Sequence, residues 1–326
     1  MLPDVGDLRS SLRVVSLPLV TRFRGITVRE AALVEGPAGW SEFAPFLEYE
    51  DAEAATWLAA AIAFGWEAAT PTRRDRIPVN ATVPTVPSAE VAGLLARFPG
   101  TRTAKVKVAD AAGHLADDVA RVAAVREALG PAGRVRIDAN GGWTVDEAER
   151  ALRALAPFDL EYAEQPCATI DELAQLRRRT RDLAVPIAAD ESVRKATDPL
   201  AVARSGAADL LVLKAAPLGG VRAAAGLAAQ AGLPVVVSSA LDTSVGLAMG
   251  AFLAAALPEL PYDCGLGTAA LLAADVTHEP LTPVDGAIPV RRVVPDPDLL
   301  DRFAADADRT AWWRERLLRC HHLLPA

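Results

Sequence analysis

Hydrophobic and polar residues follow a repeating pattern from about residue 78 onward. In each unit a short run rich in Val, Ile or Leu ends in a polar residue, and an Ala-rich stretch with helical spacing follows a turn. The runs lie at 77–80, 104–108, 135–138, 160–164, 185–190, 210–214, 234–238 and 261–264. Their polar end residues recur every 24 to 31 residues. This alternation predicts parallel strands that are joined by helical crossovers.

Eight such units favour a TIM-like (β/α)8 barrel, which we expect over residues 78–283. A doubly wound sheet is the competing architecture, but the sequence has no GxGxxG or GxxxxGK[ST] phosphate loop. Two helix starts support the alternation, because Thr144 and Thr169 are each followed three residues later by Glu, the spacing of a capping box.

The two ends of the chain follow a different pattern. Residues 12–19 and 25–35 read as strands of an antiparallel meander, and residues 51–64 read as a helix. Beyond residue 284 the pattern predicts more sheet and then a helix over 298–321. We therefore expect an α+β capping domain that combines residues 1–77 with a C-terminal segment, residues 284–326.

Composition and charge exclude several classes of protein. With 326 residues, 51% hydrophobic and 23% charged, the chain has a globular balance. Its net charge of −8 argues against a nucleic-acid or anionic-membrane surface, and no apolar stretch reaches the roughly 20 residues of a membrane span. Three widely spaced Cys predict neither a disulfide framework nor a zinc cluster. We expect a cytoplasmic enzyme without a signal peptide, and either a monomer or a homo-oligomer.

Candidate metal ligands stand where three consecutive predicted strands end, at Asp138, Glu164 and Asp190. Active sites of such barrels lie at the carboxyl ends of the strands. Buried carboxylates in a row repel one another, and a divalent cation removes that cost. Three oxygen ligands suit Mg²⁺, so the sequence predicts a magnesium site there.

Lysines flank the three carboxylates. Only four of the 34 basic residues are Lys, and Lys105, Lys107 and Lys214 fall on the strands on either side. Lys105 and Lys107 are two residues apart, so both should point into the barrel. Neighbouring positive charge should lower the pKa of Lys107 and make its amine a general base, with Lys214 across the barrel. This arrangement suits removal of a proton α to a carboxylate. The fourth lysine, Lys195, reads as a solvated helix face.

These residues stand in motifs that resemble the enolase superfamily. The motifs are Lys105-Val-Lys107, Asp138-Ala-Asn140, Glu164-Gln-Pro166, Asp190-Glu-Ser192, the segment 214–220 and the segment 238–246. The resemblance implies a modified (β/α)7β barrel with a cap, and Mg²⁺, or Mn²⁺ as a substitute, on the three carboxylates. It also implies that Lys107 abstracts the α-proton and that Lys214 stabilises the enediolate from the other face. Candidates for contacts to a small anionic carboxylate substrate are Lys105, Arg136, Asn140, Ser238, Ser239 and, from a cap loop, Arg24.

Within the superfamily the chain is most similar to the branch that forms o-succinylbenzoate for menaquinone biosynthesis. That resemblance implies loss of water from a succinyl-hydroxycyclohexadiene carboxylate. The mandelate-racemase branch uses a His where Ser238 stands, and Asp263-Cys-Gly265 breaks the Asp-x-Asp motif of the dipeptide epimerases. N-acylamino-acid racemases and muconate cycloisomerases share the two lysines and remain open. A Schiff-base barrel using Lys214 and a non-catalytic barrel are the alternatives from other classes.

Overall fold

Seven short parallel strands form most of the barrel wall, and they are hydrogen-bonded in sequence order from β5 to β11. The computed structural model describes residues 2–23, 25–111, 113–195 and 198–325. The barrel strands are β5 (Ala81–Val83), β6 (Thr103–Lys107), β7 (Arg134–Asp138), β8 (Leu160–Glu164), β9 (Ile187–Ala189), β10 (Leu210–Leu213) and β11 (Val235–Val237). Their residues are almost all buried, as expected for parallel strands that are covered on both faces.

A short segment joins the two edges of this sheet. Cys264 forms a parallel bridge with Val79, and Gly265 forms one with Ser238. The amide of Cys264 donates to the Pro78 carbonyl at 2.8 Å, and the amide of Gly265 donates to the Val237 carbonyl at 2.8 Å. The eighth position of the barrel is therefore filled, which confirms the predicted fold class.

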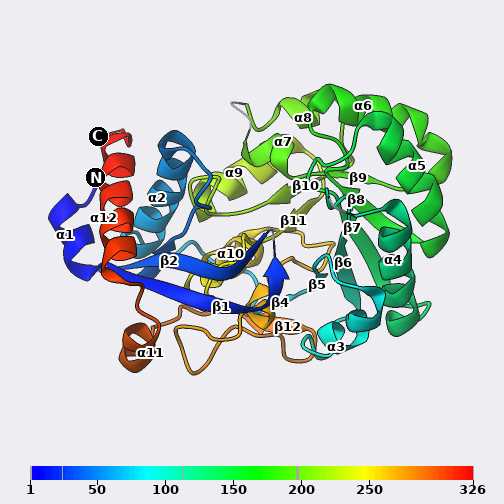
Figure 1. Ribbon diagram of the computed structural model, residues 1–326. Helices are drawn as coiled ribbons and strands as arrows, with labels where there is room; N and C mark the ends of the chain where they lie inside the picture. The colour runs from blue at the N-terminus through cyan, green and yellow to red at the C-terminus, as the bar shows by residue number, and fades with distance from the viewer. Residues whose placement is uncertain (1, 24, 112, 196–197, 326) are drawn as a thin grey trace.

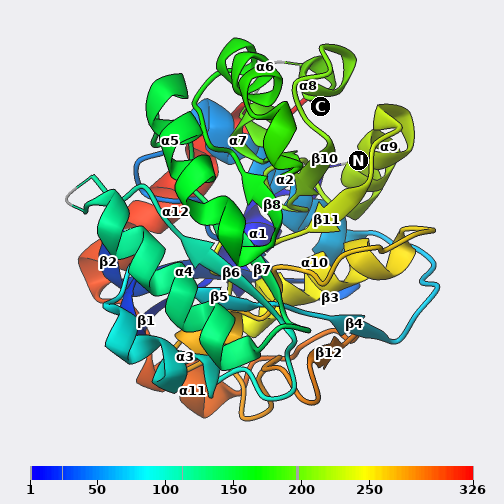
Figure 2. The ribbon, with the colours of Figure 1, turned by 90° about the vertical axis from the view of Figure 1, so that its right-hand side faces the viewer.

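Helices cover the outside of the barrel, and Figure 2 shows α4, α5 and α6 around strands β6 to β8. These helices are α3 (Val91–Leu95), α4 (Leu115–Leu129), α5 (Val145–Leu155), α6 (Ile170–Arg179), α7 (Glu191–Arg194), α8 (Ala201–Arg204), α9 (Val221–Ala231) and α10 (Ser244–Ala256). Both predicted capping boxes are confirmed. The Glu147 and Glu172 carboxylates each accept a hydrogen bond from the amide of the Thr three residues earlier, at 2.9 Å.

Both ends of the chain build the cap, which lies to one side of the barrel in Figure 1. Its elements are α1 (Val5–Ser11), β1 (Arg13–Phe23), β2 (Ile26–Gly36), β3 (Gly39–Phe43), α2 (Asp51–Trp66), α11 (Pro297–Arg302) and α12 (Ala307–His322). The antiparallel sheet β1-β2-β3 and α2 share a core with α12, which contributes Trp313, Leu317 and Cys320.

The structure differs from the sequence prediction at two places in these outer elements. The single helix expected over 298–321 is divided into α11 and α12, because Ala304 forms a β-bridge with Val15 of β1. The run at 77–80 does not form a single strand. Its first half belongs to β4 (Arg76–Pro78), which pairs antiparallel with β12 (Ala287–Pro289), so the first strand of the seven-stranded sheet begins at Ala81. Among the described residues, no helix is long and apolar enough to cross a membrane.

Candidate active site

Three carboxylates lie side by side at the carboxyl ends of β7, β8 and β9. The strand register pairs Asp138 with Glu164 and Glu164 with Ala188. Asp190 lies two residues beyond Ala188, so it is the next position on the inward face. The relative exposures of Asp138, Glu164 and Asp190 are 1%, 1% and 0%. The fold therefore gathers the predicted metal ligands in one buried place.

Lysine ammonium groups contact all three carboxylates. Lys105 Nζ lies 2.8 Å from Glu164 Oε1 and 3.2 Å from Asp138 Oδ2. Lys107 Nζ lies 2.5 Å from the same Asp138 oxygen, and Lys214 Nζ lies 2.5 Å from Asp190 Oδ2. Both lysines of β6 thus point inward, as the alternation predicts, and Lys214 approaches from the other side. Three carboxyl groups and three lysine amines thus meet at the mouth of the barrel.

Burial and these close charges set the pKa values of the cluster. Burial, with the positive charge of Lys105 adding to it, lowers the pKa of Lys107 despite the opposing effect of Asp138. Burial also acts against the charge of Lys105, but Glu164 and Asp138 outweigh it and hold the Lys105 pKa well above its usual value. The two lysines are therefore not equivalent. Lys107 gives up a proton more readily than Lys105, in the direction predicted for a general base.

The acids differ from one another in the same way. Burial and the nearby Asp138 raise the pKa of Glu164 to about 8. Burial would also raise the pKa of Asp138, but Lys107 and Lys105 hold it well below its ordinary value. The three lysine ammonium groups thus leave Glu164 short of compensating positive charge. A set of three buried carboxylates of this kind fits a hard divalent cation.

The distances between the three carboxylates are set by the lysine ammonium groups that lie between them. Lys105 stands between Asp138 and Glu164, while Asp190 is bound to Lys214. We asked which three potential metal ligands among the described residues have their ligand atoms within 4.8 Å of one another. The group that meets this distance is His278, Asp296 and Asp298, near the surface. Asp138, Glu164 and Asp190 do not meet it. Asp138, Glu164 and Asp190 have the burial and the oxygen chemistry for a divalent metal, whereas their present separation suits the ammonium groups.

Around the lysines and carboxylates, further polar residues form hydrogen bonds at the rim of the barrel. Of Asn140, Glu191 and Arg194, the sequence predicts only Asn140. Asn140 accepts a hydrogen bond from Lys107 Nζ at 2.7 Å and donates to Glu191 Oε1 at 3.2 Å. Arg194 donates to Asp190 Oδ1 at 3.1 Å and to Glu191 Oε1 at 2.7 Å. Sequence reasoning missed Glu191 and Arg194, although the spacing of Arg194 to Asp190 and Glu191 is that of contacts within one helical turn.

The other predicted substrate contacts are placed differently from one another. Ser238 and Ser239 both direct their hydroxyls to the Gly265 carbonyl, at 3.5 and 2.7 Å. Arg136 is fully buried one layer deeper in the barrel, where it donates to the Asp263 carbonyl at 2.6 Å and pairs with Glu161 at 2.5 Å. The structure thus brings the serines to the site but not Arg136. Arg24 lies outside the described residues.

The space above the lysines is small and partly aromatic. A cavity of about 30 Å³ is lined by Lys105, Lys107, Lys214, Asn140, Ser238, Ser239 and the cap residues Phe23 and Phe46, among others. Pockets for small molecules have volumes of about 300–1,000 Å³, so this cavity is too small for a substrate that contains a ring. The ring of Phe23 lies 5.8 Å from Lys107 Nζ. The cap therefore closes over the candidate base, and a ring-containing substrate requires these side chains to move.

A barrel with a cap and with this cluster of lysines and carboxylates is the architecture of one known class of proteins, and the sequence matches family models of the same class. Residues 89–296 match the family described as Enolase C-terminal domain-like, and residues 14–65 match Enolase N-terminal domain-like. The chain belongs to the enolase superfamily. Members of that superfamily use a divalent metal ion, in agreement with the buried carboxylates.

Some individual proteins of the superfamily have a high sequence identity to this chain over almost its whole length. The chain is 60% identical over 319 residues to an o-succinylbenzoate synthase of Mycobacterium marinum, covering 98% of this chain and 95% of the relative. It is 58% identical over 325 residues to an o-succinylbenzoate synthase of Mycobacterium tuberculosis, covering 99% and 98%.

Solved structures share the fold at lower identity. A muconate lactonizing enzyme from Pseudomonas fluorescens, complexed with muconolactone, superposes with a TM-score of 0.75 at 24% identity over 90% of this chain and 98% of its own. A 2-chloromuconate cycloisomerase from Rhodococcus opacus gives a TM-score of 0.75 at 26% identity, over 91% and 98%. At 24% identity, the similarity to the muconate lactonizing enzyme supports the barrel-and-cap fold alone.

Proposed function

We propose that this chain is a carbon–oxygen lyase that removes water from a succinyl-hydroxycyclohexadiene carboxylate and releases o-succinylbenzoate, a step of menaquinone biosynthesis. The observation that carries the proposal is the identity of 58–60% to o-succinylbenzoate synthases over almost the whole chain. The cluster of three lysines and three carboxylates supports it, because the chemistry begins with removal of a weakly acidic proton next to a carboxylate.

In this reaction Lys107 is the general base. Its neutral amine takes the α-proton, and the electron pair of the C–H bond moves into the substrate carboxylate to give an enediolate. Burial and Lys105 favour the neutral amine by lowering the Lys107 pKa. The C–O bond then breaks as the same ammonium returns its proton to the leaving hydroxyl. The products are water and an aromatic ring, so atoms and charge balance without any other reactant.

Lys214 acts from the other face as a fixed positive charge. Its ammonium is held at 2.5 Å by Asp190 and is 11% exposed. A positive group in such a water-poor site stabilises developing negative charge more than the same group would in water. Lys105, Asn140, Ser238 and Ser239 line the cavity and would orient the substrate. Arg136, one layer below, would support Lys105, which is its neighbour in the β6–β7 register.

Asp138, Glu164 and Asp190 would hold Mg²⁺, with Mn²⁺ as a substitute. The donor chemistry supports this, because hard cations prefer carboxylate oxygens and Mg²⁺ keeps open positions for other ligands. When bound, the ion supplies positive charge to the substrate carboxylate. We also propose a cytoplasmic location, which is supported by three buried free cysteines.

The test is turnover of the succinyl-hydroxycyclohexadiene carboxylate by purified protein in Mg²⁺, followed by the ultraviolet absorbance of the substrate and the product. We expect activity that EDTA abolishes and that Lys107→Ala lowers by at least about a thousandfold, within the range of general-base catalysis and positioning together. Unchanged substrate in Mg²⁺, or equal rates for Lys107→Ala and wild type, would refute the proposal.

One alternative reaction uses the same two lysines. A lysine on each face of the substrate is also the arrangement that a racemase needs, and the chain carries Lys107 and Lys214 in those places. Exchange of the α-proton of an N-succinylamino acid in ²H₂O measures this activity directly. Exchange with turnover of the diene carboxylate would show two activities at one site, and exchange without it would replace the proposed function with racemisation.

A further inference from the structure

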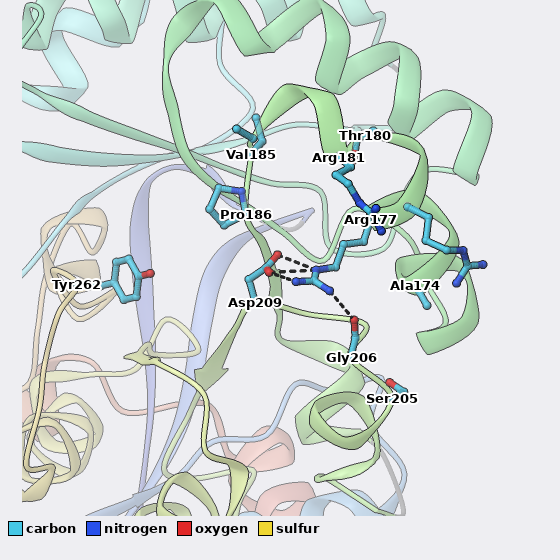
Figure 3. Close-up of a pocket in the computed structure, with 12 residues that line it drawn as sticks. Ala174, Arg177, Thr180, Arg181, Val185, Pro186, Ser205, Gly206, Asp209 and Tyr262 are labelled. Carbon is cyan, nitrogen blue, oxygen red and sulfur yellow. Dashed lines mark hydrogen bonds and ion pairs between the residues drawn. The ribbon is translucent and has the colours of Figure 1, made fainter.

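A hollow of about 500 Å³ opens at the amino-terminal end of the barrel, opposite the candidate active site. Figure 3 shows its walls, with Tyr262 on one side, Arg177 and Arg181 on the other, and Asp209 between them. Pro186 and Asp209 directly precede β9 and β10, so the hollow lies where these strands begin. Pockets for small molecules have volumes of about 300–1,000 Å³, and this one falls within that range.

The arginines at the end of α6 differ in their partners. Arg177 binds Asp209 with two hydrogen bonds from Nε, at 3.0 and 3.1 Å, and Arg179 pairs with Asp146 of α5 at 2.5 Å. The side chains of Arg178 and Arg181, which line the hollow, have no hydrogen-bond or ion-pair partner in the part of the chain that the structure describes. Since Arg177 neutralises Asp209, the hollow holds two uncompensated guanidinium groups in a chain whose net charge is −8.

The remaining wall combines the small polar residues Thr180 and Ser205 with an apolar part. Ala174, Ala184, Val185 and Pro186 contribute aliphatic surface, and Tyr262 contributes a ring. Guanidinium groups bind carboxylates and phosphates through charge-assisted hydrogen bonds, but an inorganic anion would leave this apolar surface in water. The guanidinium groups and the apolar surface together suit an organic anion better than an inorganic one.

We propose that the hollow is a second ligand site, which binds a small organic acid that carries a carboxylate on an apolar body. Arg178 and Arg181 bind the carboxylate, and Val185, Pro186 and Tyr262 cover the body. Arg136 lies over the rings of both Tyr162 and Tyr262, and this buried layer separates the hollow from Lys105. A ligand in the hollow therefore does not compete with a ligand at the candidate active site.

The test is calorimetric titration of the full chain with benzoate and with inorganic phosphate, in Mg²⁺ and again in EDTA. We expect saturable binding of benzoate that EDTA does not change, and weaker binding of phosphate. Arg178→Gln/Arg181→Gln should weaken benzoate binding at least about tenfold, the effect of losing charge-assisted hydrogen bonds worth about 1.4 kcal/mol. Turnover should stay at the wild-type rate, because neither arginine lies near the lysine cluster.

The matched control is Arg150→Gln/Arg179→Gln, which removes the same charge from residues that do not line the hollow. It should bind benzoate like the wild type. No saturable binding, equal loss in both double variants, or loss of binding in EDTA would each overturn the proposal, while phosphate binding as tight as benzoate would overturn the assignment to an organic acid. None of these results depends on which reaction the active site performs.

Discussion

Arg194 connects the cap to the carboxylate cluster, and its replacement gives a sharp prediction. Its Nη1 donates to the hydroxyl of Tyr49 in the cap at 3.0 Å. Its other nitrogens bind Asp190 and Glu191, and its side chain is 3% exposed. One guanidinium thus fixes a predicted metal ligand, a rim carboxylate that faces Asn140, and the position of the cap.

The size of the effect follows from these contacts. Arg194→Met keeps an unbranched apolar side chain but leaves the buried Asp190 and the partly buried Glu191 with one cation fewer, and breaking a buried ion pair in this way costs about 3–5 kcal/mol. Lys214 still compensates Asp190, so we expect a value near the lower end, about 3 kcal/mol. Tyr49→Phe removes only the hydroxyl and should cost about 1.5–2 kcal/mol, the lower part of the range for one hydrogen bond to a charged group.

Urea unfolding followed by fluorescence measures both variants, and steady-state kinetics with a Mg²⁺ titration measures the site. We expect Arg194→Met to raise the Mg²⁺ concentration needed for half-maximal activity, and Arg194→Lys to recover stability more than Mg²⁺ affinity, because Lys keeps the charge but not the planar fork. Wild-type stability for Arg194→Met, or an equal loss for Tyr49→Phe, would refute this account of the contact.

Four further outcomes are expected. Lys107→Arg should keep the charge and the fold and lose turnover, because a guanidinium has a much higher pKa than an ammonium and gives up no proton; circular dichroism and the turnover assay check both parts. Lys195→Arg should change the free energy of unfolding by less than about 0.5 kcal/mol and leave kcat unchanged, because the exposed Lys195 Nζ lies 4.6 Å from the Tyr49 ring, a contact that Arg also makes. Burial and Asp242 raise the pKa of Glu42 to about 8, so the folded state binds this proton more tightly than the unfolded state, and ionisation of Glu42 should destabilise the wild type as pH rises from about 4.5 to about 8. Glu42→Gln should therefore be more stable than the wild type in urea unfolding at pH 8 and equally stable near pH 4, and the same difference at both pH values would contradict this. Thr144→Ala should cost about 1 kcal/mol in the same assay through loss of the capping box at α5, and no loss would count against that cap.

The sequence predicts the inward cluster well because strand alternation is a strict geometric rule. Lys105 and Lys107 are two apart, so they share a face, and parallel register then brings Asp138 and Glu164 beside them. The same rule says nothing about depth. Arg136 faces inward like Asp138, but two residues along a strand correspond to about 6.6 Å, which moves it from the mouth of the barrel into its interior.

Other parts of the site depend on contacts that no local pattern contains. Arg194 has a local spacing to Asp190 and Glu191, but its hydrogen bond to Tyr49, far away in sequence, has no local signal. The sequence pattern also predicts the start of the first barrel strand a few residues too early, for a similar reason. The run at 77–80 is apolar enough for a strand, but pairing of β4 with β12 uses its first half, and only the long-range partner decides this.

The shared core of the cap has a consequence for the order in which the protein is made. Glu30 of β2 accepts a hydrogen bond from Trp313 Nε1 at 2.8 Å, and the two residues are 283 positions apart. During synthesis the sheet β1-β2-β3 therefore leaves the ribosome long before the helix that completes its core, while the βα units between them can pair with near neighbours as they emerge. The cap that covers Lys107 is finished only after α12 has emerged, so the site closes after all the barrel strands have been made.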